Sequence, residues 1–274
     1  MTAKEFNWQT HDGLGLFGRE WLTEAKPKGV VHIVHGLGEH CGRYQHVAER
    51  LTAAQYDVRA FDLRGHGKSE GKRGHTPSYN ALMEDIRAFL ARTPNDRSAD
   101  FFLYGHSLGG NLVLNFVLRQ KPKLNGAVVT APLLLPAQKI PPLKLKLGRL
   151  FNRLMPSLLL PNDIDVRDLS RDQQVGEIYS KDPLVHDRVS ARLGTTMLEA
   201  GVWALEHAGE FSLPLLLMHG SDDHLTSPQA SKEFAEKAPD CTFKLWDGFY
   251  HELHNEPEQD QVLSYIIDWL DAHC

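Results

Sequence analysis

One pentapeptide carries the clearest chemical signal in the chain. Gly105-His106-Ser107-Leu108-Gly109 fits the pattern G-x-S-x-G, with a strand-forming run, Phe101–Tyr104, before it and an apolar helix, Leu108–Leu118, after it. In that setting the serine lies on a tight, strained turn, and the two glycines avoid side-chain clashes. A glycine-rich turn with an incidental serine is the competing interpretation, but it does not explain the flanking strand and helix. We therefore predict that Ser107 is a nucleophile.

A serine hydroxyl attacks a carbonyl only when a base removes its proton, so a carboxylate and a histidine are needed. In strand–turn–helix sites they follow the serine in that order. The acid is expected directly after the apolar strand Leu213–Met218, where Asp222 and Asp223 both occur. Either could serve. We favour Asp223, because Asp222 fits a loop residue that forms turn hydrogen bonds.

The base is expected after the last strand, Thr242–Trp246. His251 is the histidine closest to the end of that strand, which leaves His254 as a pocket residue. In the expected mechanism His251 takes the proton of Ser107, Ser107 attacks an ester carbonyl, and Asp223 holds the imidazole. Water activated by His251 then hydrolyses the acyl-enzyme.

The oxyanion of such a reaction needs two fixed N–H donors. The backbone of Leu108 should supply one, and the loop His35–His40 the other. We assign the second donor to Leu37, because flanking glycines let this loop approach the substrate closely. The same region admits a metal hypothesis based on four nearby side chains. However, their spacing matches no known ligand set, so we expect neither a metal nor a cofactor. These side chains are His32, His35, Glu39 and His40.

Strand and helix signals alternate along most of the chain, which is typical of an α/β fold with a mostly parallel central sheet and helices on both faces. A proline-punctuated stretch interrupts this alternation from Pro132, and it resumes near Leu213. We predict an α/β core formed by residues 1–132 and 209–274, with a helical cap inserted at residues 133–208. The other predicted elements are strands at Glu5–Thr10, Leu14–Leu22, Gly29–Val34, Tyr56–Asp62 and Gly126–Thr130, and helices at Tyr44–Ala54, Ser78–Ala91, Ser227–Lys237 and Glu258–Asp271.

Composition narrows the class of protein. The chain has 274 residues with 30 basic and 35 acidic side chains, a net charge of -5, which argues against a nucleic-acid partner. Three cysteines without a spacing pattern predict free thiols in a reducing compartment. The first ten residues lack the apolar region of a secretory signal, and no run is long enough to span a bilayer. We expect a cytoplasmic protein, with peripheral membrane association through the cap as an open alternative.

The motifs together resemble those of the monoacylglycerol lipases of the α/β-hydrolase superfamily, over nearly the whole chain. This resemblance implies the α/β-hydrolase fold, hydrolysis of monoacylglycerols to glycerol and a fatty acid, and Ser107, Asp223 and His251 as the catalytic triad. The matching segments are His35–His40 with Gly42–Tyr44, Asp62–Ser69, the Ser107 pentapeptide, Gly220–Asp223 and Tyr250–His254.

The resemblance also implies a polar pocket for the glycerol head group. By position, Glu39, Arg43, Tyr179 and His254 would line or support it. Leu37 is a departure, because the mammalian enzymes have a smaller residue there. Its bulk would narrow the pocket, although its donor is a backbone group.

Within the expected cap, Ile140–Leu160 mixes many leucines with basic residues. Such a stripe can rest on an anionic lipid surface or pack as a lid over the pocket, and the two roles are compatible. The local basic charge of an otherwise acidic protein favours membrane contact.

Three alternatives remain beside a monoacylglycerol lipase. A lysophospholipase or a general carboxylesterase would use the same triad with a different head-group pocket. A ligand-binding receptor can keep an intact triad on this fold. Epoxide hydrolase and dehalogenase chemistry is disfavoured, because those enzymes carry a carboxylate at the position of Ser107.

Overall fold

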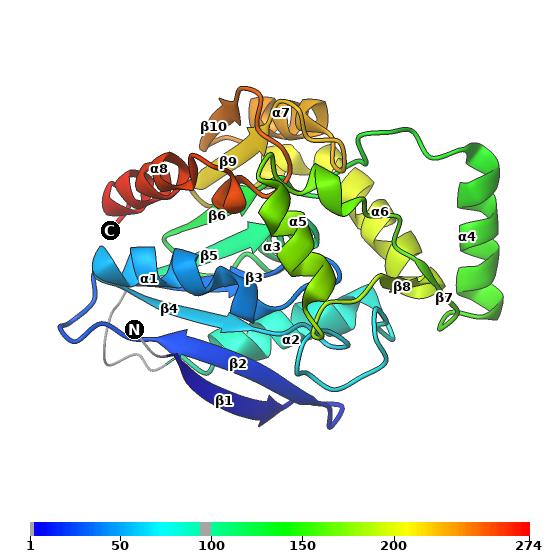
Figure 1. The fold of residues 1–274 in the computed structure, drawn as a ribbon, viewed down its shortest axis with the longest axis horizontal. Coiled ribbons are helices and arrows are strands. Elements are labelled where there is room, and N and C mark those ends of the chain that lie inside the picture. Colours follow the sequence, from blue (N-terminus) through cyan, green and yellow to red (C-terminus); the bar gives the residue numbers. More distant parts are fainter. Residues whose placement is uncertain (1–2, 94–99) are drawn as a thin grey trace.

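An eight-stranded sheet forms the centre of the molecule (Figure 1). The computed structural model describes residues 3–93 and 100–274. The strand order is β1-β2-β4-β3-β5-β6-β9-β10, and only the β1–β2 and β2–β4 pairs of this sheet are antiparallel. The strands are β1 (Lys4–Gln9), β2 (Gly15–Trp21), β3 (Gly29–Val34), β4 (Tyr56–Phe61), β5 (Phe101–His106), β6 (Gly126–Thr130), β9 (Leu215–Gly220) and β10 (Cys241–Trp246).

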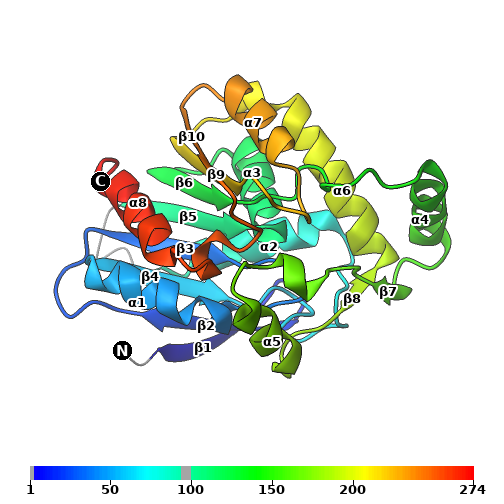
Figure 2. The same cartoon turned by 45° about the horizontal axis from the view of Figure 1, so that its top comes forward.

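Helices cover both faces of this sheet (Figure 2). The apolar face of α1 (Gln45–Ala53) and that of α8 (Gln259–Asp271) pack on one side, with Tyr104 of β5 and Met218 of β9. On the other side, α2 (Tyr79–Leu90), α3 (Leu108–Gln120), α6 (Ala191–Glu206) and α7 (Pro228–Lys237) share a second apolar cluster. The sheet is therefore buried on both faces, as its continuous apolar strands require.

Most predicted elements agree with these bounds to within one or two residues. Strand β9 is shifted by two residues at both ends. Strand β5 continues two residues further than predicted, to His106, and so carries the chain directly into Ser107. The helix expected from Leu108 is buried at every position from Leu108 to Leu118, because it packs against both the sheet and α6. The predicted α/β fold with a mostly parallel sheet is confirmed.

The chain between β6 and β9 departs from the βαβ pattern. It contains the short antiparallel pair β7 (Leu159–Pro161) and β8 (Arg188–Ser190), which was not predicted because three residues carry too little periodicity. It also contains α4 (Pro142–Leu154), α5 (Gln173–Lys181) and α6. The remaining short turns are 3-10 helices: η1 (Cys41–Tyr44), η2 (Val166–Asp168), η3 (Ala208–Glu210) and η4 (Leu253–Asn255).

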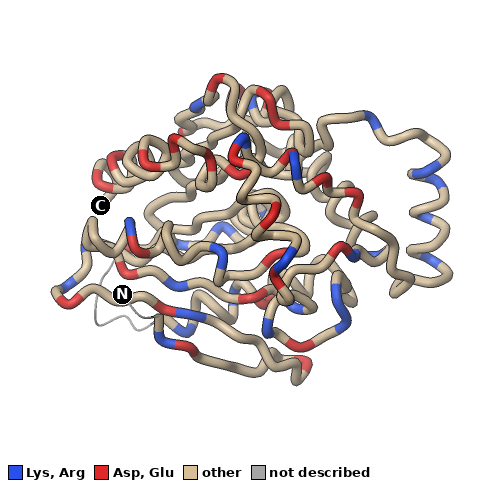
Figure 3. Tube along the Cα trace, in the orientation of Figure 1, with Lys and Arg blue, Asp and Glu red and all other residues tan. Residues whose placement is uncertain are grey.

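Helix α4 stands apart from the sheet at one end of the molecule and packs against α6 (Figure 1). Every residue of α4 is exposed or half-buried. Its charged side chains are all basic, as Figure 3 shows. Across residues 3–93 and 100–274, no helix combines the length and the apolar character needed to cross a bilayer.

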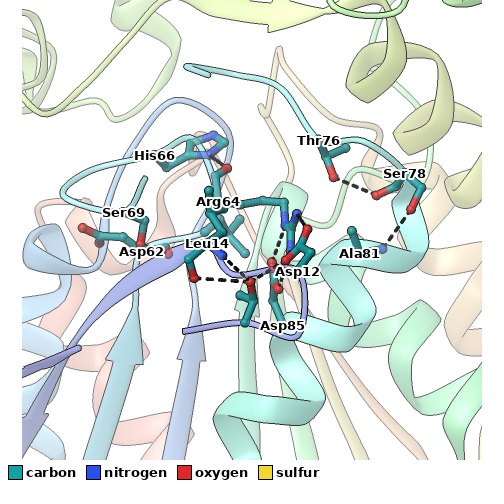
Figure 4. A network of polar contacts seen from close by, with 12 residues as sticks. Asp12, Leu14, Asp62, Arg64, His66, Ser69, Thr76, Ser78, Ala81 and Asp85 are labelled. Carbon is teal, nitrogen blue, oxygen red and sulfur yellow. Dashed lines mark hydrogen bonds and ion pairs between the residues drawn. The ribbon is translucent and has the colours of Figure 1, made fainter. Parts of the chain in front are cut away.

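The loop after β4 is held by a buried arginine (Figure 4). Arg64 donates to both oxygens of Asp85 on α2, at 2.6 and 2.7 Å, and to Asp12 in the turn between β1 and β2. Asp62 accepts from the backbone N–H of Cys41 and of Lys68. These contacts give the Asp62–Ser69 motif a structural role: it joins the N-terminal hairpin, α2 and the loop after β3.

Candidate active site

Ser107 lies at the junction of β5 and α3 in a strained conformation. Its φ is 53° and its ψ is −115°, which a non-glycine residue adopts only where packing enforces it. A Cβ on Gly105 would lie 2.5 Å from the carbonyl oxygen of Gly109, and one on Gly109 would lie 1.9 Å from that of Val34. The expectation that both positions must be glycine is confirmed. The turn presents Ser107 beside the loop that follows β3.

Asp223 and His251 come together from two different loops. His251 Nδ1 lies 2.7 Å from Asp223 Oδ2, and both side chains are buried. Asp222, the alternative acid, is exposed, and its carboxylate accepts from the hydroxyl of the neighbouring Ser221. Of the two aspartates left open by the chain order, the geometry therefore pairs Asp223 with the imidazole.

The electrostatics of this pair suit a general base. Burial alone would lower the pKa of His251, but the charge of Asp223 and its hydrogen bond raise the pKa above its ordinary value. Burial would raise the pKa of Asp223, yet the charges and hydrogen bonds of His251 and His219 hold that pKa well below its usual range. Asp223 is consequently ionised and can only accept hydrogen bonds.

Ser107 lies near the Asp223–His251 pair, because its chain neighbour His106 contacts His251. The ring centroid of His106 lies 4.7 Å from that of His251. Within the described residues no hydrogen bond joins the Ser107 hydroxyl to His251. Such bonds are often open in ligand-free hydrolases and close when substrate binds.

The two expected oxyanion donors lie on segments that touch. Leu108 is the first residue of α3, where backbone N–H groups have no partner within the helix. Leu37 follows β3, and its neighbour Gly36 is so close to Ser107 that an added Cβ would lie 3.2 Å from the serine Cβ. The absence of a side chain at Gly36 thus lets the chain next to Leu37 lie close to Ser107.

A buried ion-pair network lies beside the histidine loop. Arg43 Nη1 lies 2.7 Å from Glu39 and 2.6 Å from Glu252, and Arg43 Nη2 lies 2.7 Å from the second oxygen of Glu252. Burial would raise the pKa of Glu252, but Arg43 lowers the pKa to about 2. Glu39 also accepts from the Gly36 N–H at 2.6 Å and from the Tyr44 hydroxyl at 2.9 Å. The network therefore fixes the loop that carries Leu37.

Two further polar side chains of the expected head-group pocket lie against this network. The guanidinium carbon of Arg43 lies 4.7 Å from the ring centroid of Tyr179, and His254 stacks on Tyr44 at 4.9 Å. The Tyr179 hydroxyl and both ring nitrogens of His254 are buried and have no hydrogen-bond partner among the described residues. Burial lowers the pKa of His254 to about 3, so its ring is neutral. These are polar atoms available to a ligand.

The four side chains of the metal hypothesis have separate partners. His32 Nε2 lies 2.6 Å from the Thr93 hydroxyl, His35 Nε2 accepts from the Leu63 N–H, and His40 pairs with Asp182 at 2.9 Å. No group of three or more His, Cys, Asp or Glu side chains in the described parts of the chain could hold a metal ion.

Sequence patterns missed several residues around the acid. Thr226 donates to Asp223 Oδ2 at 2.9 Å, and His219 Nε2 lies 3.0 Å from the same oxygen. Both lie within four positions of Asp223, but no motif marks them as its partners. Glu252 is adjacent to His251 in the chain, and its pairing with Arg43 depends on a long-range contact that spacing does not reveal.

Comparisons with known proteins show which family this chain is similar to. A family model described as serine aminopeptidase, S33, matches residues 25–258. A monoacylglycerol lipase of Mycolicibacterium smegmatis is 32% identical over 276 residues, covering 99% of this chain and 98% of that protein. The crystal structure of a Paleococcus ferrophilus monoacylglycerol lipase is 35% identical, with a TM-score of 0.84 and 100% of both chains covered. An abhydrolase domain-containing protein of Dictyostelium discoideum is 40% identical over 274 residues; the match covers 98% of this chain but 29% of that protein.

The sheet and the strained serine turn define an α/β hydrolase. The chain belongs to the serine aminopeptidase S33 family and, within it, to the monoacylglycerol lipases, and it is a carboxylic ester hydrolase. The resemblance inferred from the motifs is thereby confirmed.

Proposed function

We propose that this enzyme hydrolyses monoacylglycerols to glycerol and a free fatty acid through an acyl-enzyme on Ser107. The observation that carries the proposal is the set of buried polar atoms without partners, on Tyr179 and His254, beside a buried Asp223–His251 pair. Buried polar groups without partners are costly, so a site that keeps them is suited to a ligand with hydroxyl groups. The glycerol head group of a monoacylglycerol has two free hydroxyl groups.

In the proposed reaction His251 accepts the proton of Ser107 as the hydroxyl attacks the ester carbonyl. The N–H groups of Leu37 and Leu108 stabilise the oxyanion, and the imidazolium returns its proton to the departing glycerol oxygen. Water then enters, His251 removes its proton, and the acyl-enzyme is cleaved to release the fatty acid. Asp223 stays ionised throughout and stabilises the imidazolium.

The head-group assignment is tested with the smallest possible change. Tyr179→Phe removes a hydroxyl that forms no hydrogen bond among the described residues, so the fold should tolerate it. We expect kcat/KM for a monoacylglycerol to fall roughly tenfold. Hydrolysis of a short p-nitrophenyl ester, which has no glycerol, should stay within twofold of the wild-type rate, to order of magnitude.

Tyr265→Phe on α8 is the matched control, since Tyr265 packs against the apolar cluster under α1 and α8. Equal losses on both substrates in Tyr179→Phe would contradict a head-group role.

A panel of monoacylglycerol, lysophospholipid and p-nitrophenyl ester separates the alternatives. A preference for the lysophospholipid, or no preference, would favour a lysophospholipase or a general carboxylesterase. Negligible turnover of every ester would favour a ligand-binding receptor.

We further propose that residues 133–208 form a cap whose helix α4 contacts an anionic lipid surface. Large apolar side chains on and next to α4 are exposed, among them Leu143 at 68% and Leu154 at 65%. Four basic residues lie on the same helix, and apolar side chains with basic neighbours favour anionic membrane surfaces. This arrangement would hold the enzyme where lipid esters are concentrated.

Co-sedimentation with phosphatidylglycerol-containing and pure phosphatidylcholine vesicles tests the lipid contact. Binding should require the anionic lipid, and Leu143→Asp with Leu154→Asp should abolish it. Val202→Asp, which changes an exposed apolar residue of α6, is the control. Equal binding by all variants would contradict the role of α4.

A further inference from the structure

A second imidazole contacts the oxygen of Asp223 that holds His251. His219 is the next-to-last residue of β9 and is fully buried. Its Nε2 lies 3.0 Å from Asp223 Oδ2, the atom that also lies 2.7 Å from His251 Nδ1. One carboxylate oxygen is therefore shared by two histidines.

The hydrogens in this cluster follow from the charge of Asp223. An ionised carboxylate only accepts, so the protonated nitrogens must be Nδ1 of His251 and Nε2 of His219. The other ring nitrogen of His219, Nδ1, lies 2.8 Å from the hydroxyl of Ser231 on α7, and that side chain is also buried. For neutral His219, Ser231 is then the donor, and a chain of hydrogen bonds runs from α7 to the catalytic acid.

We infer that His219 is a positioning residue that acts through Asp223: it holds the carboxylate toward His251 and withdraws part of its negative charge. This inference rests on the proposed role of Asp223 as the catalytic acid. Asp223 Oδ1 is already fixed by the backbone N–H groups of Leu225 and Thr226. At Oδ2, His219 at 3.0 Å and the Thr226 hydroxyl at 2.9 Å are the two contacts besides His251, and of these two only His219 is an imidazole.

The hydrogen bond from His219 should align the Asp223 carboxylate and, at the same time, lower the basicity of His251. Each hydrogen bond to a carboxylate stabilises its charge and weakens its pull on a neighbouring proton. Removing His219 should therefore raise the pKa of His251, so that the base stays protonated, and inactive, up to a higher pH. Packing alone would lower the reaction rate without moving this pKa.

The other charged and titratable groups around His251 are not substituted in such a variant. The charged or titratable side chains that face it from neighbouring elements are Asp223, Glu39, Glu252, His106 and His254. A shift seen in a His219 variant is then attributable to the shared oxygen.

The test is the pH dependence of the labelling rate with a fluorophosphonate, which reports the free enzyme and needs no substrate assignment. The labelling rate should fall at low pH as His251 becomes protonated, and this fall is the acid limb of the profile. In His219→Leu the midpoint of the acid limb should move up by roughly one pH unit. His219→Gln keeps an N–H donor near the position of Nε2 and should stay close to wild type. His32→Leu removes another buried imidazole, packed against Phe89 of α2, and controls for lost stability.

An unchanged acid limb in His219→Leu, or equal shifts in His219→Leu and His219→Gln, would overturn the inference. If His219→Leu does not fold, Ser231→Ala replaces it in the test, because this change frees His219 from the hydroxyl that fixes its tautomer. Ser231→Ala should move the acid limb in the same direction by a smaller amount. An unmoved acid limb in Ser231→Ala would overturn the inference. Ser107→Ala, labelled in parallel, separates the two claims. Labelling of Ser107→Ala would overturn the proposed function itself.

Discussion

His251 Nδ1 and Asp223 Oδ2 lie 2.7 Å apart, although 28 positions separate the two residues in the chain. The contact depends on β9 and β10 being parallel neighbours, so that the loops after both strands emerge at the same edge of the sheet. A Cβ on Gly220 would lie 2.2 Å from the Phe249 carbonyl oxygen, which shows how closely the two loops approach. The sheet edge thus brings Asp223 and His251 together.

Neutralising each of the two neighbouring aspartates should separate their roles. Asp223→Asn should lower kcat by roughly 10³–10⁴-fold, because the amide favours the wrong imidazole tautomer. Asp222→Asn should stay within about twofold, since Asp222 is exposed and bonded to Ser221. Similar losses in steady-state turnover of a p-nitrophenyl ester by both variants would argue against Asp223 as the acid.

The raised pKa of His251 predicts the acid side of the pH profile. The base must be neutral to accept a proton, so kcat/KM should fall as pH drops through this pKa, above the ordinary histidine value of 6.5. The profile should be measured on a p-nitrophenyl ester, whose acyl group does not titrate. An acid limb at or below 6.5 would mean that Asp223 does not raise the basicity of His251.

The Arg43 network predicts a large and pH-dependent loss of stability. Arg43→Met leaves two buried carboxylates without their cation and should lower the free energy of unfolding by about 3 kcal/mol at pH 7. Glu252 has a folded pKa of about 2 against an ordinary 4.5, so its stabilising contribution is present above pH 4.5 and is lost as pH falls toward 2. The deficit of Arg43→Met should therefore shrink below pH 4.5.

Arg149→Met, which breaks an exposed ion pair with Glu199 on α6, is the control and should shift Tm by about 1 °C or less. Denaturant unfolding at several pH values gives the free energy of unfolding of each variant, and thermal melts give Tm. A deficit in Arg43→Met that stays the same from pH 7 to about pH 3 would contradict the electrostatic explanation.

Two glycine substitutions should have opposite effects on stability. Gly109→Ala would place a Cβ 1.9 Å from the Val34 carbonyl oxygen and should prevent folding or displace α3. On the exposed helix α4, an added Cβ at Gly148 would meet only the Thr195 hydroxyl, at 3.6 Å. Gly148→Ala should stabilise that helix by about 0.5–1 kcal/mol. Circular dichroism melts would contradict this reasoning if both variants melted like the wild type.

Local patterns predicted the core of this fold well, because each element carries its own periodicity. The turn at Ser107 could be predicted from the strand before it and the helix after it. The order of the acid and the histidine along the chain then predicted one short loop for each. The choice between Asp222 and Asp223 was harder, since adjacent residues share the same loop and differ only in which one turns inward.

Other features depend on contacts that sequence spacing does not encode. The pairing of Arg43 with Glu252 spans 209 positions and requires the loop after β3 to meet the one after β10. His219 lies inside an apolar strand, where a histidine resembles any buried polar residue until its neighbours are known. The short β7–β8 pair is likewise tied to a distant segment, since the Ser190 N–H donates to the carbonyl oxygen of Gly74.

The role of Ser107 is tested most directly by covalent labelling. A fluorophosphonate should label the wild-type enzyme once, and peptide mass spectrometry should find the adduct on Ser107. Ser107→Ala should fold with an unchanged circular dichroism spectrum, remain unlabelled and hydrolyse no monoacylglycerol. Labelling of Ser107→Ala, or an adduct on another residue of the wild type, would contradict Ser107 as the nucleophile.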